Sequence, residues 1–130
     1  MDEVDREILR LLKENSRRSY IEIGRKVGLS EGAVRRRVKK LVEEGLITRF
    51  TIEVRNEVEG IILIKTHPSK TRDVSEKVRQ LSSKVFEVSG EFDVAALLSA
   101  STIDEMNKLV DEIRRLPAVL STNTLIKLVE

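Results

Sequence analysis

Residues 19–45 read SYIEIGRKVGLSEGAVRRRVKKLVEEG, and this stretch decides the fold of the first part of the chain. Ser19 and Glu22 have the spacing of a capping box, in which a hydroxyl and a carboxylate satisfy the first free N–H groups of a helix. Gly28 suits the end of that helix, because glycine accepts left-handed dihedral angles. Ser30 is a favourable N-cap for the next helix. The stretch therefore predicts two helices joined by a tight turn.

The second of these helices is basic on one side. Its apolar residues recur at helical spacing and form an inward stripe: Val34, Val38 and Leu41. At about 100° per residue, Arg36 and Lys40 point almost opposite this stripe. Residues 17–40 hold 9 Lys/Arg and 2 Asp/Glu, a local charge of +7 (9 − 2). Such a patch suits a phosphate backbone, and the alternative is a solvated helix face.

A major groove admits one α-helix, whose exposed face must supply donors to bases and charge to phosphates. The two helices and their turn therefore predict a helix-turn-helix that binds double-stranded DNA. We expect the DNA contacts to come from the start, the exposed face and the flanks of the basic helix: Ser30, Gly32, Arg35, Arg36, Arg37, Lys39 and Lys40.

Outward from this stretch, the other elements follow from hydrophobic periodicity and turn residues. Residues 4–15 predict a first helix, with Asp2 or Asp5 near its start as cap or dipole partner. The expected elements after residue 47 are strands over 48–54 and 60–65, a helix over 73–81, strands over 85–88 and 94–98, a helix from its Thr102 cap to Arg115, and a last strand over 119–129.

The order after residue 59 is β-α-β-β-α-β, the ferredoxin-like arrangement of an antiparallel sheet with two helices on one face. We therefore predict an α+β chain in three parts. Residues 1–50 are expected to form a three-helix, winged-helix-like helix-turn-helix domain, residues 51–59 a connecting strand or linker, and residues 60–130 a ferredoxin-like domain.

Composition excludes several classes of protein. Hydrophobic residues make up 40% and charged residues 35%, which favours a globular core. The absence of cysteine and the single histidine exclude disulfides, thiolate chemistry and multi-histidine metal sites. We expect no metal and no cofactor. The longest apolar run, residues 60–64, is far shorter than the about 18 residues of a membrane span, so we expect no membrane partner and a cytoplasmic protein.

An enzyme is not expected either. The sequence contains no P-loop, G-x-S-x-G or H-E-x-x-H motif. An acylphosphatase-type hydrolase on the ferredoxin-like fold needs an arginine in a phosphate-cradling loop, and residues 66–71 contain none.

Several stretches resemble the leucine-responsive/AsnC (Lrp/AsnC) regulators. They are residues 23–30 (IGRKVGLS) with the basic helix after them, 89–93 (SGEFD) and 121–124 (STNT). Residues 111–114 and 122–124 are most similar to archaeal members linked to lysine biosynthesis. Gly24 departs from the alanine usual in the family, and a mid-helix glycine costs about 1 kcal/mol relative to alanine. Arg37 matches a family arginine and is expected to hold a phosphate or the position of the helix.

The resemblance implies a transcription regulator that dimerises through its C-terminal sheets, often assembles into octamers and binds free amino acids between dimers. It places the effector near the turn and the last strand, and our candidates are Ser89, Gly90, Glu91, Asp93, Thr122 and Thr124. Backbone N–H groups at Gly90 and Glu91 with the two threonine hydroxyls would bind a carboxylate, and Asp93 an ammonium group.

Simpler interpretations of this turn exist, because Gly90 can be a hairpin glycine and Asp93 a turn residue that bonds its own backbone. The two acids nearby favour a cationic effector, lysine or arginine. The alternative function is an architectural DNA-binding protein whose C-terminal domain only oligomerises.

Overall fold

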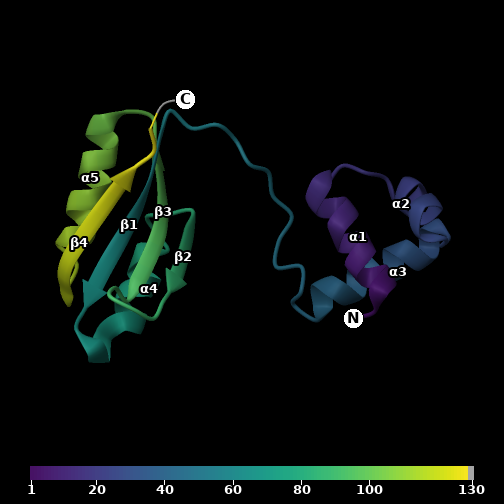
Figure 1. The fold of residues 1–130 in the computed structure, drawn as a ribbon, viewed down its shortest axis with the longest axis horizontal. Helices are drawn as coiled ribbons and strands as arrows, with labels where there is room; N and C mark the ends of the chain where they lie inside the picture. Colours follow the sequence, from purple (N-terminus) through teal and green to yellow (C-terminus); the bar gives the residue numbers. More distant parts are fainter. Residues whose placement is uncertain (129–130) are drawn as a thin grey trace. The chain divides into compact units, whose positions relative to one another are not determined.

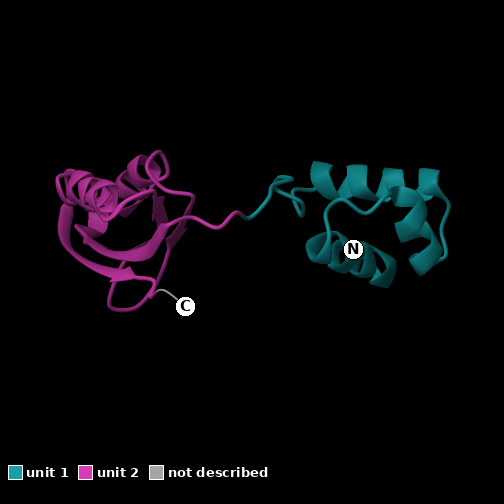
Figure 2. Ribbon diagram, turned by 90° about the horizontal axis from the view of Figure 1, so that it is seen from above, with its two compact units in different colours: residues 1–53 teal, residues 54–130 magenta. Residues whose placement is uncertain are grey.

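The computed structural model describes residues 1–128, and the predicted strand residue Val129 lies outside them. The chain divides into two compact units, Met1–Glu53 (unit 1) and Val54–Glu130 (unit 2), shown in different colours in Figure 2. The division falls inside the predicted linker. No helix in the described part combines the length and the apolar character needed to cross a membrane.

Unit 1 consists of α1 (Glu3–Glu14), α2 (Tyr20–Val27) and α3 (Glu31–Glu43). The α1 N-cap is Asp2, whose side chain accepts a hydrogen bond from the Asp5 N–H. The hydroxyls of Ser19 and Ser30 cap α2 and α3. Each cap satisfies an N–H group that has no partner inside its helix, so short polar residues set where the helices begin. The buried core joins all three helices: Ile8, Leu11, Ile23, Val34 and Val38.

The turn between α2 and α3 is tight, and two glycines permit it. Gly28 is the C-cap of α2 with φ of 76°, a left-handed conformation that favours glycine. A Cβ on Gly24 would lie 2.3 Å from the carbonyl oxygen of Leu29, so this glycine lets the turn approach the helix backbone. The close approach of the turn therefore explains why glycine is present at position 24 despite its cost in helix propensity.

The strand predicted over residues 48–54 is wrong. These residues are extended and exposed but belong to no sheet. A strand needs a neighbouring backbone to accept and donate its hydrogen bonds, and residues 48–54 pair with none of the sheet's four strands, the first of which is β1 (Val58–Thr66). Alternating side chains therefore predicted an extended segment here but not its pairing.

Unit 2 adds η1 (Pro68–Lys70), α4 (Thr71–Val78), β2 (Lys84–Glu87), β3 (Val94–Ala100), α5 (Ile103–Arg114) and β4 (Val119–Ile126). The antiparallel sheet has the order β2-β3-β1-β4 (Figure 1). Both helices lie on one side of it (Figure 2). The predicted α+β fold class, a three-helix unit followed by a ferredoxin-like unit, is confirmed.

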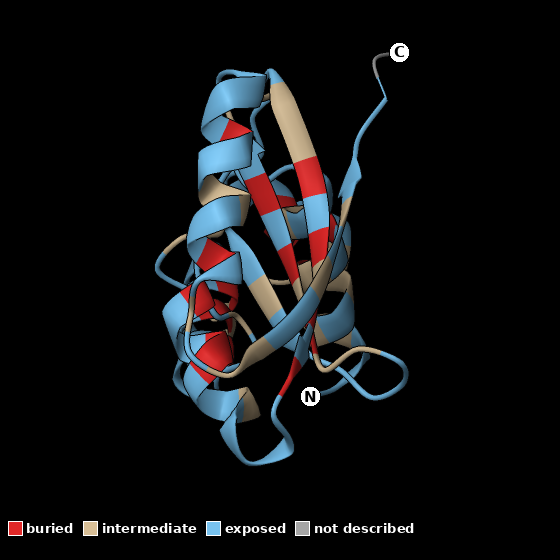
Figure 3. Ribbon diagram, turned by 90° about the vertical axis from the view of Figure 1, so that its left-hand side faces the viewer, coloured by how far each residue is buried: buried red, intermediate tan, exposed pale blue. Residues whose placement is uncertain are grey.

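Strand parity separates two faces of this sheet, and buried and exposed positions alternate along the strands (Figure 3). The helix-covered face holds the core, which includes Ile62, Ile64, Val94, Ala96 and Leu98 with Val74, Met106 and Ile113 of the helices. We call the other side the open face. Its residues, taken from the strand register, are Glu59, Ile61, Leu63 and Lys65 on β1, Ala95, Leu97 and Ser99 on β3, Lys84 and Phe86 on β2, and Ser121, Asn123 and Leu125 on β4.

Candidate functional site

The basic helix α3 is fixed by its apolar stripe. Val34, Val38 and Leu41 are buried at 0%, 4% and 2% exposure, so the opposite side of the helix is left to solvent. Ser30 caps the helix through a hydrogen bond from the Ala33 N–H at 3.2 Å. The hydroxyl of Ser30 is thus already used as an acceptor, and Gly32 adds no side chain to the exposed first turn.

The three consecutive arginines of α3 have different surroundings. Arg35 pairs with Glu31 and lies over the ring of Tyr20, 5.1 Å from its centroid. Arg36 is exposed, and its Nη1 lies 3.5 Å from the Cβ position of Gly32. Arg37 is only one-third exposed and contacts α1 instead. The sequence grouped all three as candidate DNA contacts, and the structure separates them.

The two lysines complete the exposed side of α3. Lys40 lies 3.8 Å from Glu44, a loose pair between exposed side chains. Within residues 1–128, Arg36 and Lys39 have no ion-pair partner. These two cations therefore need not break a contact of their own to meet a phosphate or a base.

A network of ion pairs runs along the exposed side of α1. Arg10 joins Glu7 and Glu14, and Arg18 joins Glu14 and Glu22. The arginines lower the pKa of Glu7 and of Glu14, Glu7 through the hydrogen bond from Arg10 and Glu14 mainly through Arg18. Arg10 and Arg18 are therefore engaged in ion pairs within unit 1, in contrast to Arg36 and Lys39 of α3.

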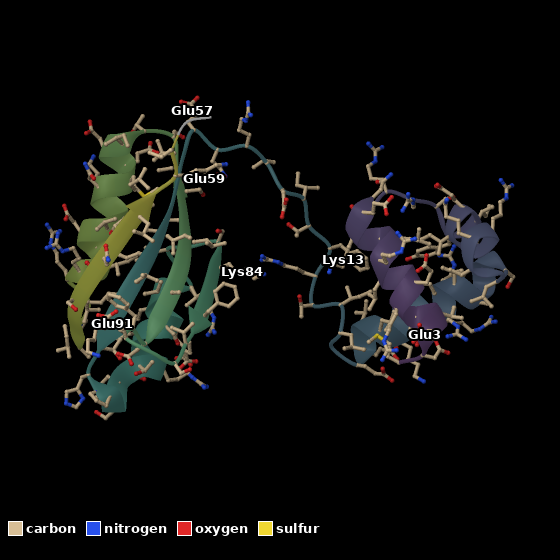
Figure 4. All side chains as sticks on the ribbon, viewed as in Figure 1. Glu3, Lys13, Glu57, Glu59, Lys84 and Glu91 are labelled. Atoms are coloured by element: carbon tan, nitrogen blue, oxygen red, sulfur yellow. The ribbon has the colours of Figure 1, made fainter. Side chains whose placement is uncertain are left out.

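The candidate effector turn lies at the end of the sheet opposite Glu59, as the labelled Glu91 shows (Figure 4). Gly90 has φ of 131°, in the region that favours glycine. The Asp93 N–H donates to the Ile64 carbonyl at 2.9 Å, and Asp93 Oδ2 accepts from the Thr66 N–H at 2.8 Å. The carboxylate thus continues the β1–β3 hydrogen-bond ladder past its last residue pair, Ile64 with Val94.

The register of β4 separates the predicted threonines from the open face. Thr122 pairs with Ile64 and Thr124 with Ile62, so both threonines share the helix-covered face, where they are half-buried at the sheet edge. Ser121 and Asn123 are the polar β4 residues on the open face, where Ser121 pairs with Lys65.

Lys65 also reaches the turn, because its Nζ donates to the Glu91 carbonyl oxygen at 3.2 Å. Sequence reasoning missed Lys65, Ser121 and Asn123. Strand periodicity contains part of the signal, because residues two apart on a strand lie on the same face of the sheet. The antiparallel pairing of β1 with β4 supplies the rest, since it fixes which residues of the two strands are neighbours.

The rest of the open face is apolar and partly exposed. Ile61, Leu97 and Leu125 are 40%, 38% and 50% exposed and line a hollow of about 440 Å³. At the rim of this hollow, Lys127 Nζ lies 3.2 Å from Glu59. Hydrogen bonds from Lys127 and from Asn56 lower the pKa of Glu59. The ion pair thus lies at one end of an apolar surface that no other residue of 54–128 covers.

Known proteins match both units. Residues 1–42 match the AsnC-type helix-turn-helix domain, and residues 59–130 match the Lrp/AsnC ligand binding domain. The HTH-type transcriptional regulator LysM of Sulfurisphaera tokodaii is 39% identical, over 98% of this chain and 95% of its own. The regulator Ptr1 of Methanocaldococcus jannaschii is 37% identical, over 86% and 80%.

Solved structures share the whole fold. AsnC of E. coli superimposes with a TM-score of 0.78 at 25% identity, covering 100% of this chain and 93% of its own. The complex of the regulator NMB0573 with L-Met from Neisseria meningitidis has a TM-score of 0.82 at 21% identity, covering 100% and 91%. The chain therefore belongs to the Lrp/AsnC family of transcription regulators, and it joins a DNA-binding helix-turn-helix unit to a ligand-binding unit.

Proposed function

We propose that this regulator binds specific DNA sequences as a homodimer, in the cytoplasm, and that a free amino acid changes its affinity for them. One observation carries the DNA part: α3 holds Arg36 and Lys39 exposed and without an ion-pair partner among residues 1–128, while the opposite stripe of the helix is buried. We assign the DNA-facing surface to Ser30, Gly32, Arg35, Arg36, Lys39 and Lys40.

The open face of unit 2 supports the dimer. Monomeric proteins seldom expose a contiguous apolar patch of this kind. Phe86, Leu97, Ile61 and Leu125 lie on four adjacent strands of one sheet face. A second copy that covers the face with the same residues gives a two-fold interface, and two recognition helices then reach successive half-sites about 34–36 Å apart. Further assembly into octamers belongs to the same proposal.

The turn at Gly90–Asp93 supports the amino-acid site. Asp93 uses Oδ2 for the Thr66 N–H, which leaves Oδ1 to face an ammonium group. Lys65 and the backbone N–H groups of the turn offer partners for a carboxylate. The exposed Glu91 favours a cationic side chain, so lysine and arginine are the first candidates. The Neisseria regulator with L-Met bound supports amino acids as the ligand class.

The DNA assignment is tested on duplexes selected from a random pool by the purified protein. Arg36→Ala with Lys39→Ala is compared with Lys77→Ala with Arg79→Ala, a matched pair on unit 2. If both α3 cations contact phosphates, affinity falls at least about tenfold and the slope of log K against log salt falls by about 1.8. Equal affinity of the two double variants would refute the assigned surface.

The effector assignment is tested by a thermal-shift screen of the twenty amino acids, because a ligand that binds only the folded form stabilises it. Titration calorimetry then compares wild type with Glu91→Gln and with Asp73→Asn, an exposed acid on α4. Weaker binding of lysine or arginine only by Glu91→Gln supports the site. Wild-type protein that binds none of the twenty would favour the architectural function.

A further inference from the structure

Arg37 lies at the flank of the surface that we assign to DNA, and its side chain contacts the start of α1. Its Nη1 donates to Asp2 Oδ1 at 2.9 Å, to Asp2 Oδ2 at 2.8 Å and to Asp5 Oδ1 at 3.1 Å. The Asp5 side chain is 16% exposed and that of Arg37 33%. The ion pair is thus partly shielded from solvent, unlike the exposed pair between Arg35 and Glu31. Asp2 and Asp5 lie 35 and 32 positions from Arg37 in the chain.

The same two carboxylates cap α1. Asp5 N–H donates to Asp2 Oδ1 at 2.8 Å, and Asp2 N–H donates to Asp5 Oδ2 at 3.3 Å, a reciprocal capping box. The start of α1 and the middle of α3 are therefore held by one cluster, which we call the Asp2–Asp5–Arg37 clamp. Its net charge is −1, because two carboxylates surround one guanidinium, so it offers no attraction to a phosphate.

We infer that Arg37 is a positioning residue, which fixes the direction of α3 against α1 through the Asp2–Asp5–Arg37 clamp and does not itself contact DNA. The inference rests on the proposed DNA-binding function. A helix enters a major groove productively only when several side chains meet their partners together. A contact that removes the freedom of α3 to tilt therefore increases DNA affinity without adding a phosphate contact. The hydrogen bonds from Arg37 and from the Asp5 N–H lower the pKa of Asp2 from 3.8 to about 2, the direction expected when these contacts stabilise the charged carboxylate.

Salt dependence separates positioning from phosphate contact. Arg36→Met removes a proposed phosphate partner from the adjacent position and should lower the salt slope by about 0.9. Arg37→Met removes the same charge one residue away. We expect it to lower affinity about tenfold, the size of a typical coupling within such a network, while the slope stays at the wild-type value. Arg37→Lys should recover part of the affinity, because an ammonium can still reach the carboxylates.

Asp2→Asn makes the test sharper, because a simple charge effect and loss of the clamp predict opposite changes in DNA affinity. Asparagine caps a helix as well as aspartate does, so α1 keeps its N-cap. Removing a negative charge from a DNA-binding unit should by itself strengthen binding to DNA. Loss of the clamp instead predicts weaker binding. In a double-mutant cycle, Asp2→Asn should add little to Arg37→Met, since the contact is already gone.

All variants are compared at a temperature where circular dichroism shows them folded, on the full chain and the same selected duplex. The inference is overturned if Arg37→Met lowers the slope as Arg36→Met does, if Asp2→Asn binds DNA as well as or better than wild type, or if the variants change only the thermal midpoint. Wild-type protein that binds no duplex defeats the proposed function instead. In that case the clamp can still be measured by thermal unfolding, where the effects of Asp2→Asn and Arg37→Met on stability should not add.

Discussion

Unit 1 and unit 2 differ in the interactions that hold them together and in the side chains that they expose. In the described residues, nine of the twelve ion pairs lie in unit 1. Most of these pairs join residues three or four positions apart, and they leave Arg36 and Lys39 unpaired on α3. Unit 2 is held by pairing between strands distant in sequence, and it exposes an apolar sheet face. The comparison shows that unpaired positive charge lies on the DNA-binding unit, whereas exposed apolar area lies on unit 2, the unit through which we propose that two copies associate.

The largest expected effect tests the assembly half of this comparison. Leu97→Asp places a charge in the middle of the open face. We expect association of two copies to weaken by about 100-fold or more, because an uncompensated buried charge costs about 3–5 kcal/mol. Sedimentation equilibrium measures it. Ile103→Asp is the control, because Ile103 is also exposed but starts α5, where an acid complements the helix dipole. A Leu97→Asp protein that remains as strongly dimeric as the control would contradict the assignment of the face.

The second prediction concerns close packing in unit 1. Gly24→Ala should lower its free energy of unfolding by about 1–2 kcal/mol, because overpacking against the Leu29 carbonyl exceeds the gain in helix propensity. Gly32→Ala is the matched change in α3, where a Cβ meets only the Arg36 guanidinium at 3.5 Å. It should raise the same free energy by up to about 1 kcal/mol. Urea unfolding followed by helical circular dichroism measures both changes in the free energy of unfolding. If both substitutions raised it, the turn would be able to relax around the added methyl group.

The third prediction asks whether the two units unfold separately. Ser19 and Thr102 each accept a hydrogen bond from an N–H three residues later, both at 3.1 Å. Ser19→Ala should destabilise unit 1, and Thr102→Ala unit 2, each by about 1 kcal/mol. Hydrogen exchange resolved by residue locates the loss. If either substitution increased exchange equally in both units, the division at residues 53 and 54 would not be a boundary of stability.

The smallest effect is a pH dependence of unit 1. The folded-state pKa of Asp2 is lowered from 3.8 to about 2, so its contribution to stability is complete above the unfolded value of 3.8 and is lost as the pH falls toward 2. Asp2→Asn lacks this contribution. The difference in thermal midpoint between the two proteins should therefore be constant above about pH 5 and shrink below about pH 4. Glu7 and Glu14 also have lowered pKa values, but they are present in both proteins and cancel. A difference that is flat down to pH 2 would show that the carboxylate of Asp2 contributes no charge interaction.

Local pattern was sufficient for much of the fold. The caps at Ser19, Ser30 and Thr102, the turn at Gly28 and the order of strands and helices in unit 2 all followed from short-range spacing. Such features depend on hydrogen bonds and periodicities within a few residues, which the chain carries wherever it folds. The strand over 48–54 failed because pairing needs a partner strand, and alternation cannot supply one. Apolar spacing alone also misleads at Ile103, the first residue of α5, which is 53% exposed whereas Met106 and Ile113 of the same helix are buried.

The candidate site depended more on packing between distant segments. The family's turn located Gly90 and Asp93, but only the register of β4 on β1 placed Ser121 and Asn123 on the open face and Thr122 and Thr124 on the other. Likewise, residues 35–37 are one run of arginine in the sequence, and only the folded helices direct Arg37 to Asp2 while Arg36 stays exposed. The sequence determines which side chains a helix or strand carries and, through the periodicity of the element, which of them share a face. Which of those side chains find a partner far along the chain is decided by how the elements pack, because that geometry is absent from any short segment.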